Sequence, residues 1–416
     1  TLFPYTTLFR SYPKCISENY DYMQLVLLSG GSGKRLCPLS NNVRSKQFLP
    51  LLEKEDGTIE SMVQRVVRQA KAAGLTNAIT LATNTSQLDI ITNQLGDTVS
   101  VVTEPECRDT FPAIALAASY LHFAKCCADD EVIVIMPCDP YTEADYFETI
   151  GKMVECVKRD VAELVLMGIT PTYPSEKYGY VMPIASDNEY KMVSYFTEKP
   201  TVERAKELLA ENAYWNGGVF AFRLGYMMNI VKKYIALNSF EDTRNRYSEL
   251  PKISFDYEVA EKAESVAVVP FAGEWKDLGT WNTLTNELHK SVFGNAVMGA
   301  HCENTYVINE FQNPIYVNGL KDVLVAACPD GILVCSKTHL EEIKKAVENL
   351  ISRPMCGERR WGIYRVLDDS TYEGGQHSFT KSITLNSGKN ISYRFITTVQ
   401  RFGLSYKAKV FLSLMA

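Results

Sequence analysis

The sequence predicts an α/β protein with a mainly parallel sheet, followed by a small β domain. Two features of the chain lead to this prediction. From Gln24 to about Leu288, short apolar strands alternate with amphipathic helical patterns, an order typical of a parallel sheet covered by helices. After His289 the pattern changes to short β-like pieces separated by turn residues, which indicates a separate β domain.

Five near-continuous apolar runs are expected to form the strands of the sheet, because strands covered on both faces need no polar alternation. These runs are residues 25–29, 78–82, 99–104, 132–137 and 164–169. In sheets of this kind ligands bind at the carboxyl ends of the strands. The polar and glycine residues that follow the runs are therefore candidates for a site.

The later part of the chain is expected to hold two smaller units. Residues 291–350 contain the pieces TYVIN, PIYVN, DVLVAA and GILVCS and a closing helical stretch. The segment RPMCGERR indicates a linker, and residues 351–416 form a last unit with strand-like alternation. At the other end, residues 1–22 are interpreted as a non-native or disordered leader, of which 1–11 resemble a translated sequencing adaptor.

Composition narrows the class of protein. A chain of 416 residues favours two or three domains. A net charge of −6 with interspersed charges disfavours a nucleic-acid-binding surface. No apolar run reaches the roughly 18 residues of a membrane-spanning helix and no signal peptide is evident, so we expect a cytoplasmic protein. The 11 cysteines fit reduced thiols better than a disulfide framework or a zinc site.

A glycine-rich turn follows the first expected strand. Gly30, Gly31 and Gly33 lack a Cβ, so their N–H groups could approach a phosphate or a base edge closely. Arg35 and Lys46 follow and would supply the countercharge. The spacing fits neither the Walker loop nor the dinucleotide fingerprint. An ordinary tight turn is the alternative interpretation.

Two aspartates are candidates for holding Mg²⁺. Asp139 directly follows the apolar run 132–137, at the expected carboxyl edge of the sheet, and Asp277 lies in the segment WKDLGTW. Carboxylate oxygens are the ligands that Mg²⁺ prefers. A turn aspartate before Pro140 is the alternative for the first of them.

Two further segments combine polar groups with glycine or proline. FTEKP contains Glu198 and Lys199, and a solvated surface pair is its alternative interpretation. In YWNGGVFAF, Asn216 and Gly217 interrupt an aromatic strand. An amide flanked by glycines suits hydrogen bonding to a sugar hydroxyl, whereas a glycine pair inside a strand is also typical of a bulge.

The order of these motifs resembles the sugar-phosphate nucleotidylyltransferases, and most closely the bacterial mannose-1-phosphate guanylyltransferases. The family signature GGxGxRLxPLS followed by PKQF corresponds here to GGSGKRLCPLS and SKQF. The family segments EPxxRxTxPAIALAA, PADH, YGY, FVEKP, WNSGMFLF and WSDVGSW correspond to EPECRDTFPAIALAA, MPCDP, EKYGYV, FTEKP, WNGGVFAF and WKDLGTW. The resemblance covers about residues 25–350.

The resemblance implies both an architecture and a reaction. It implies a Rossmann-like, GT-A-like nucleotidyltransferase domain over residues 23–290, with a mixed sheet flanked by helices. A small left-handed β-helix-like domain and a partial cupin-like segment would follow. The implied reaction transfers a guanylyl group from GTP to mannose 1-phosphate with Mg²⁺, giving GDP-mannose and pyrophosphate. Because the sugar phosphate is already an anion, no general base is expected.

The resemblance also implies roles for residues of this chain. The catalytic group is Arg35, Lys46 and Lys199; the nucleotide-binding group is Gly30, Gly31, Gly33, Glu104, Arg108 and Gly179; the sugar-binding group is Glu198, Asn216 and Gly217; and the metal ligands are Asp139 and Asp277.

The chain departs from the family pattern at a few positions. Ser45 stands where the family has proline, and Cys138 and Pro140 flank the metal aspartate. None of these changes removes a charged group.

The placement of Cys37 and Cys138 predicts that thiol alkylation inhibits the protein. In the cupin-like segment His377 is the only histidine, so isomerase activity is not expected.

Two other functions stay open at this point. The protein could join another sugar 1-phosphate and nucleotide, because one sequence does not reveal hydroxyl and base contacts. It could also be a non-catalytic nucleotide-sugar-binding regulatory protein, which the retained charged residues disfavour. The sequence leaves the oligomeric state open, a homodimer included.

Overall fold

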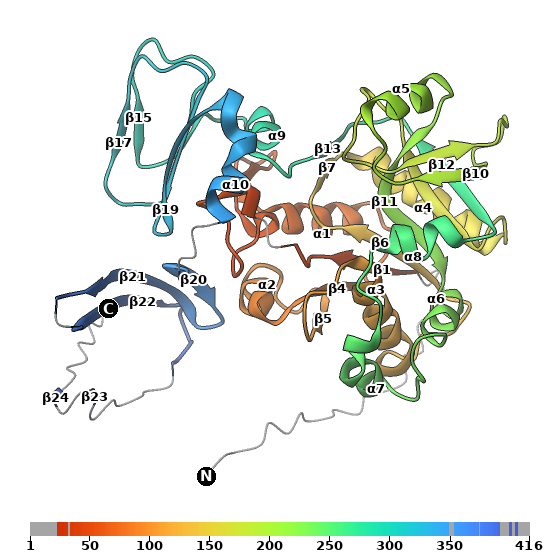
Figure 1. Ribbon diagram of the computed structural model, residues 1–416, viewed down its shortest axis with the longest axis horizontal. Coiled ribbons are helices and arrows are strands. Elements are labelled where there is room, and N and C mark those ends of the chain that lie inside the picture. The colour runs from red at the N-terminus through yellow and green to blue at the C-terminus, as the bar shows by residue number, and fades with distance from the viewer. Residues whose placement is uncertain are drawn as a thin grey trace.

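The computed structural model describes residues 23–31, 34–348, 353–373, 375–391, 399–401 and 404–406. The leader predicted over residues 1–22 and the third loop glycine, Gly33, lie outside the described residues. The largest body is built on a nine-stranded sheet (Figure 1). Its strands, in spatial order, are β5 (Ser100–Glu104), β4 (Ile79–Asn84), β1 (Met23–Leu28), β6 (Val132–Pro137), β11 (Tyr214–Arg223), β8 (Leu164–Ile169), β12 (Val266–Phe271), β10 (Lys191–Thr197) and β9 (Tyr180–Pro183).

The five predicted strands are confirmed, and the sheet is mixed, as the family resemblance implied. β5, β4, β1 and β6 run parallel, and β8 runs parallel to β12. β11 lies antiparallel between β6 and β8, and β10 and β9 are also antiparallel to their neighbours. The expectation of a mainly parallel sheet is therefore wrong beyond β6. A strand covered on both faces is apolar in either direction, so its residues do not encode its direction.

Helices cover both faces of the sheet because successive strand residues point to opposite faces. Leu25 and Leu27 pack into one buried cluster, whereas Val26 packs into the other. The helices on the first face are α1 (Met62–Ala72), α2 (Leu88–Leu95), α4 (Ala144–Lys158) and α5 (Val202–Ala210). Those on the second face are α3 (Thr110–Ser119), α6 (Leu224–Val231) and α8 (Phe255–Glu258).

Short pairings and helices complete this body. Two small antiparallel sheets pair β2 (Leu52–Glu53) with β3 (Ile59–Glu60) and β7 (Pro140–Thr142) with β13 (Trp275–Asp277). In the second of them Asp277 lies opposite Pro140. Its further helical segments include α7 (Phe240–Asn245), α9 (Trp281–Asn286) and the one-turn η2 (Lys46–Phe48).

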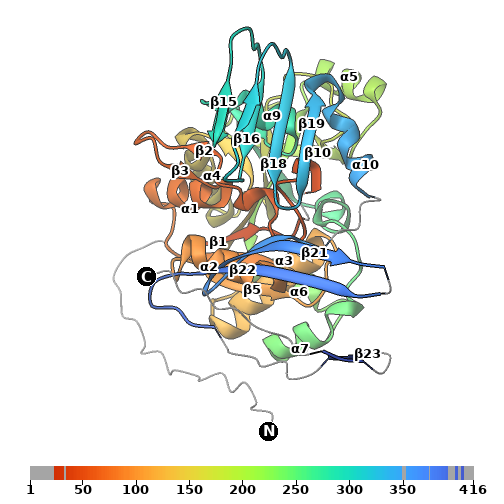
Figure 2. The same cartoon turned by 90° about the vertical axis from the view of Figure 1, so that its left-hand side faces the viewer.

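The next part of the chain forms two short parallel layers, as a β-helix does (Figure 2). One layer is β14 (Val292–Gly294), β16 (Tyr306–Asn309) and β18 (Val323–Cys328), and the other is β15 (Ala296–Met298) and β17 (Ile315–Val317). An antiparallel strand, β19 (Gly331–Ser336), pairs with β18, and α10 (Ile343–Glu348) follows. The boundary predicted at residue 290 lies between α9 and β14, and the division into domains stays a prediction.

One buried cluster joins the β layers to the sheet domain. Leu324 of β18 and Leu340, in the short helical segment after β19, pack with Leu36, Leu278 and Trp281 of the first body. The Trp281 indole Nε1 donates a hydrogen bond to the Cys37 carbonyl at 3.1 Å. The two bodies therefore share a core beside the glycine-rich turn.

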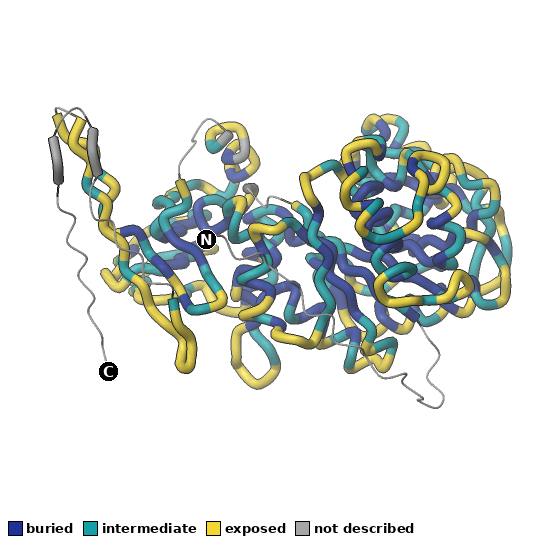
Figure 3. Tube along the Cα trace, turned by 90° about the horizontal axis from the view of Figure 1, so that it is seen from below, coloured by how far each residue is buried: buried dark blue, intermediate teal, exposed yellow. Residues whose placement is uncertain are grey.

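The last described part is a three-stranded antiparallel sheet. It consists of β20 (Cys356–Arg359), β21 (Gly362–Thr371) and β22 (His377–Leu385), and a separate pair follows, β23 (Val399–Arg401) with β24 (Leu404–Tyr406). Arg359 contacts α2 through an ion pair to Asp89 at 3.3 Å. Buried residues gather in the large body, whereas much of β22 is exposed (Figure 3). Within the described ranges no helix is long and apolar enough to cross a membrane.

Replacing a central residue of β1 should destabilise the sheet domain. Leu27 is fully buried and faces Leu81 and Met136 on the neighbouring strands. Leu27→Ala should lower the free energy of unfolding by about 2–5 kcal/mol, because it removes buried methyl groups and leaves a cavity. Urea unfolding followed by tryptophan fluorescence measures this change. Ile184→Ala, at a 54% exposed position of the same body, is the control and should cost under about 0.5 kcal/mol; equal losses would contradict the placement of Leu27 in the core.

Candidate active site

The glycine-rich turn faces a buried carboxylate. A Cβ on Gly30 would lie 3.1 Å from the Glu104 Oε1 atom, so the absence of a side chain lets the two segments approach. Glu104 ends β5, is buried, and accepts a hydrogen bond from the Tyr247 hydroxyl at 2.7 Å. Burial raises the pKa of Glu104. The ends of β1 and β5 thus bring together two residues of the predicted nucleotide-binding group.

A cleft of about 760 Å³ opens at this edge of the sheet. Its walls combine polar groups with an apolar floor from Leu28, Pro137 and Phe220. Such a cleft suits a flat ring that also needs hydrogen-bonding partners. Its polar lining includes Gly30, Gly31, Glu104, Asp109, Lys252 and Asp256.

Arg108, which was predicted on the nucleotide side, has protein partners for its guanidinium. It donates to the Leu250 carbonyl at 3.0 Å and to Glu106 at 3.0 Å. Arg108 is not among the residues that line the cleft. Its observed contacts join two loops beside the cleft.

Lys46 lies between the two predicted metal ligands. Its Nζ is 2.6 Å from Asp139 Oδ2 and 3.3 Å from Asp277 Oδ1. Asp139 sits between β6 and β7, and the pairing of β7 with β13 brings Asp277 alongside. Burial alone would lower the pKa of Lys46, but the charges of the two carboxylates outweigh it and raise that pKa. Lys46 is therefore a partly buried cation held by two anions.

The donor atoms at this point fit a divalent cation. Two carboxylates converge on one position, and hard oxygen ligands suit such an ion. Among the described residues no group of three or more His, Cys, Asp and Glu side chains could hold a metal. An ion bound by Asp139 and Asp277 would thus take its remaining oxygen ligands from a bound substrate or water.

A second cleft, of about 450 Å³, opens on the other side of Asp277. It is lined by Arg35 and Lys199 from the predicted catalytic group, and by Glu176, Lys177 and Tyr178 of the motif EKYGYV, three residues to which the sequence assigned no roles. The Lys199 Nζ lies 2.7 Å from Glu198 Oε1, and the hydrogen bond to Glu198 raises the pKa of Lys199. The cleft is thus lined by three cations, Arg35, Lys177 and Lys199, and by three carboxylates, Glu176, Asp277 and Glu341, and its cations would be the partners of an anionic group.

A polar cluster continues from this pair into the sheet. Asn216 Nδ2 donates to Asp256 Oδ1 at 2.6 Å, and the Gly218 N–H donates to Asn216 Oδ1 at 3.1 Å. Burial, and then the charge of Glu198, raise the pKa of Asp256 to about 6. Asp256 was not predicted, because its segment FDYEV carries no motif. Its carboxylate lies with Asn216, to which it is hydrogen-bonded, and near Glu198, whose charge acts on it.

The remaining two predicted glycines create space. A Cβ on Gly179 would lie 2.4 Å from Glu198 Oε2 and 2.7 Å from the Phe196 ring. A Cβ on Gly217 would lie 3.1 Å from the Ile169 side chain. Gly179 leaves room for Glu198, and Gly217 lets the bulged part of β11 pack against β8.

The structure argues against the predicted thiol sensitivity. Cys138 is buried, and burial strongly raises the pKa of its thiol. Burial also raises the pKa of Cys37, which is partly buried. Only the thiolate is a strong nucleophile. Neither cysteine should react readily in the folded protein.

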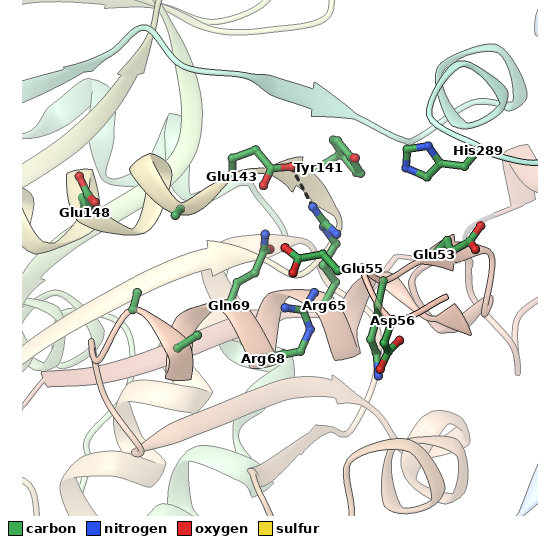
Figure 4. A pocket seen from close by; sticks show the side chains of 14 residues that line it. Glu53, Glu55, Asp56, Arg65, Arg68, Gln69, Tyr141, Glu143, Glu148 and His289 are labelled. Atoms are coloured by element: carbon green, nitrogen blue, oxygen red, sulfur yellow. Dashed lines mark hydrogen bonds and ion pairs between the residues drawn. The ribbon is translucent and has the colours of Figure 1, made fainter. Parts of the chain in front are cut away.

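A separate hollow of about 1070 Å³ contains none of the predicted site residues. It lies beside α1 and β7, where Arg65 pairs with Glu143 (Figure 4). Tyr141 and His289 also line its wall. Its lining is mostly charged and its arginines already have carboxylate partners. The convergent groups around Lys46 identify the active-site candidate better than volume does.

The sheet, the glycine-rich turn and the paired aspartates together define a nucleotidyl transferase. Residues 24–291, more than half of the chain, match the family model described as nucleotidyl transferase. The chain belongs to this family. Nucleotidyl transferases typically use a divalent metal, in agreement with the two converging carboxylates.

Several characterised proteins resemble most of the chain. A mannose-1-phosphate guanylyltransferase of Escherichia coli K12 is 29% identical over 406 residues, which cover 88% of this chain and 82% of the relative. The xanthan biosynthesis protein XanB of Xanthomonas campestris is 29% identical over 400 residues, with the same two coverages. A crystal structure described as mannose-1-phosphate geranyltransferase from Thermus thermophilus superposes with a TM-score of 0.64 at 28% identity, covering 79% of this chain and 99% of that one.

Adding a methyl group at Gly179 should disturb the polar cluster. Gly179→Ala would push the new Cβ into Glu198 and Phe196, at a cost of about 1–3 kcal/mol in the free energy of unfolding. Chemical denaturation measures the change. The control is Gly151→Ala in α4, where the nearest atom would be 3.9 Å from the new Cβ, and this variant should be at least as stable as the wild type. A neutral Gly179→Ala would show that Glu198 is not held there.

Proposed function

We propose that the protein transfers a guanylyl group from GTP to mannose 1-phosphate, giving GDP-mannose and pyrophosphate. The observation that carries the proposal is the position of Lys46, Asp139 and Asp277. Asp277 lines the smaller cleft, and Asp139 follows β6, whose last residue, Pro137, lines the larger one. The choice of mannose and guanine rests on the names of the relatives from Escherichia coli and Salmonella.

The reaction needs positioning and charge neutralisation more than proton transfer. An oxygen of the sugar phosphate attacks the α-phosphorus of GTP, the P–O bond to the β-phosphate breaks, and pyrophosphate leaves with the bonding electrons. Mg²⁺ bound by Asp139 and Asp277 would neutralise charge on the triphosphate. Lys46 would then exchange its carboxylate partners for phosphate oxygens. Arg35, which lines the smaller cleft together with Asp277, would supply a second cation.

The larger cleft would hold the nucleotide. The backbone N–H groups of Gly30 and Gly31 would face the phosphates or the base, and Glu104 would accept hydrogen bonds from the base edge. The nucleotide-side roles of Gly33, Arg108 and Gly179 stay predictions. The contacts of Arg108 and the space beside Gly179 support indirect roles for these two residues, as supports of the loops and of Glu198.

The smaller cleft and the adjoining cluster would hold the sugar phosphate. Lys199 would pair with the phosphate, while Glu198, Asn216 and Asp256, of which Asp256 also lines the larger cleft, would bind sugar hydroxyls. Carboxylates and amides at neighbouring positions suit a ligand with several hydroxyl groups. Gly217 would act by letting Asn216 reach this position. A homodimer and a cytoplasmic location stay predictions.

The direct test is pyrophosphate release across a grid of nucleoside triphosphates and sugar 1-phosphates, with and without Mg²⁺. We expect release with GTP and mannose 1-phosphate, and loss of it by at least about 10²-fold in Asp139→Ala, since a lost charge partner in the transition state costs on the order of 3 kcal/mol. Release with another pair would change the substrates and keep the chemistry. No release from folded protein that still binds GTP would indicate the regulatory alternative.

Binding of the sugar phosphate should depend on the ionisation of Asp256. Its pKa is about 6, so the carboxylate that accepts sugar hydroxyls forms as pH rises through that value. The KM for mannose 1-phosphate should therefore fall between pH 5 and pH 7. Asp256→Asn should raise KM about 10-fold to 100-fold at pH 7.5, as expected for the loss of a charged hydrogen bond, and should flatten the profile.

The sugar phosphate itself also ionises in this pH range, in the same way with the wild type and with Asp256→Asn. The difference between the pH profiles of KM of the two proteins therefore isolates the ionisation of Asp256. Parallel profiles in the wild type and Asp256→Asn would contradict a role of this carboxylate in sugar binding.

A further inference from the structure

A buried network of side chains lies beneath the glycine-rich turn. It connects the end of β1, the segment around Lys46 and the start of α2. All of its members are at most 3% exposed. They are Ser29, Ser45, Gln47, Thr83 and Gln87.

The amide of Gln87 is the centre of this network. Its Nε2 donates to Ser45 Oγ at 2.6 Å. Its Oε1 accepts from Thr83 Oγ1 at 2.5 Å and from Ser29 Oγ at 3.4 Å. A buried amide satisfied on both sides is held in one orientation, because any rotation would leave polar groups without partners.

The network holds the residues on both sides of Lys46. Ser45 precedes Lys46 and bonds to Gln87, while Gln47 follows it and donates to the Ser29 carbonyl and hydroxyl at 3.0 and 2.8 Å. Ser29 in turn precedes Gly30. One set of hydrogen bonds therefore fixes the start of the glycine-rich turn relative to the backbone that carries Lys46.

Ser45 is the position at which this chain departs from the PKQF motif. Its φ is −72° and its hydroxyl does not cap η2. This φ lies within the range that a proline ring imposes, near −65°. The serine thus holds the backbone angle of a proline without the ring, and its hydroxyl is bound by Gln87.

We propose that Gln87 is a positioning residue for Lys46, and that its hydrogen bond to Ser45 does in this chain what the proline ring does in the family motif. The role in catalysis rests on the function proposed above, whereas the restraint on the backbone does not. Removing the bond loosens the segment, and Lys46 then meets the triphosphate less precisely. A small misplacement of a charged group costs rate more than affinity.

Three single variants test the proposal. Ser45→Ala removes a single hydroxyl. It is more specific than a substitution of Gln87, which would leave the hydroxyls of Ser29, Ser45 and Thr83 without this partner at once. Ser45→Pro restores the restraint on φ without the hydroxyl. Ser119→Ala is the matched control, because Ser119 is also fully buried and its hydroxyl bonds to buried Thr243 at 2.5 Å, away from the site.

Steady-state kinetics gives the first readout. Ser45→Ala should lower kcat about tenfold with little change in the KM for GTP, Ser45→Pro should recover most of that loss, and Ser119→Ala should retain the wild-type kcat. A wild-type kcat in Ser45→Ala, a Ser45→Pro variant as slow as Ser45→Ala, or an equal loss in Ser119→Ala would each overturn the proposal.

Hydrogen exchange followed by mass spectrometry gives a second readout that needs no substrate. Ser45→Ala should speed amide exchange in the peptides that contain Gly30 and Lys46, Ser45→Pro should restore protection around Lys46, and Ser119→Ala should leave both peptides unchanged. This pattern in a protein that fails the pyrophosphate assay would support the restraint and overturn only the proposed function. Unchanged exchange in Ser45→Ala would overturn the restraint itself.

Discussion

The ammonium group of Lys46, held between Asp139 and Asp277, is the interaction around which the candidate site is organised. Two carboxylates that share one small volume repel each other unless a cation lies between them. In this structure the cation is a lysine carried by a one-turn helix that directly follows Ser45. Its partners are Asp139, between β6 and β7, and Asp277, at the end of β13, so three segments distant in the sequence converge through one balance of charge.

The two clefts differ in the chemistry of their walls. The glycine-rich turn and Glu104 lie on the side with the apolar floor, whereas Arg35, Lys199 and Tyr178 lie on the side with exposed cations. Several glycines contribute by leaving space instead of by contacting a ligand, since a Cβ would collide with Glu198 at Gly179 and press on Ile169 at Gly217. Shape and charge thus come from different residues of the same motifs.

Most strands and the charged centre of the site could be predicted from the sequence. Asp139 follows an apolar strand, and residues at the carboxyl end of such a strand meet at one edge of the sheet. The direction of β11 could not be predicted, because a strand buried on both faces is apolar either way. Asp256 could not be predicted because only tertiary packing brings it to Asn216, and one partner of Arg108, the Leu250 carbonyl, lies 142 residues away in the sequence.

The core shared between the sheet domain and the β layers sets the smallest unit that can fold with an intact site. Leu36 lies between Arg35 and Cys37 in sequence, Leu278 directly follows Asp277, and Trp281 begins α9 shortly after it. All three are buried against Leu324 and Leu340. A chain cut before β14 would turn these side chains toward water and free the turn that carries Arg35. The β layers therefore form part of the scaffold of the reaction centre, although their own residues contribute little to its chemistry.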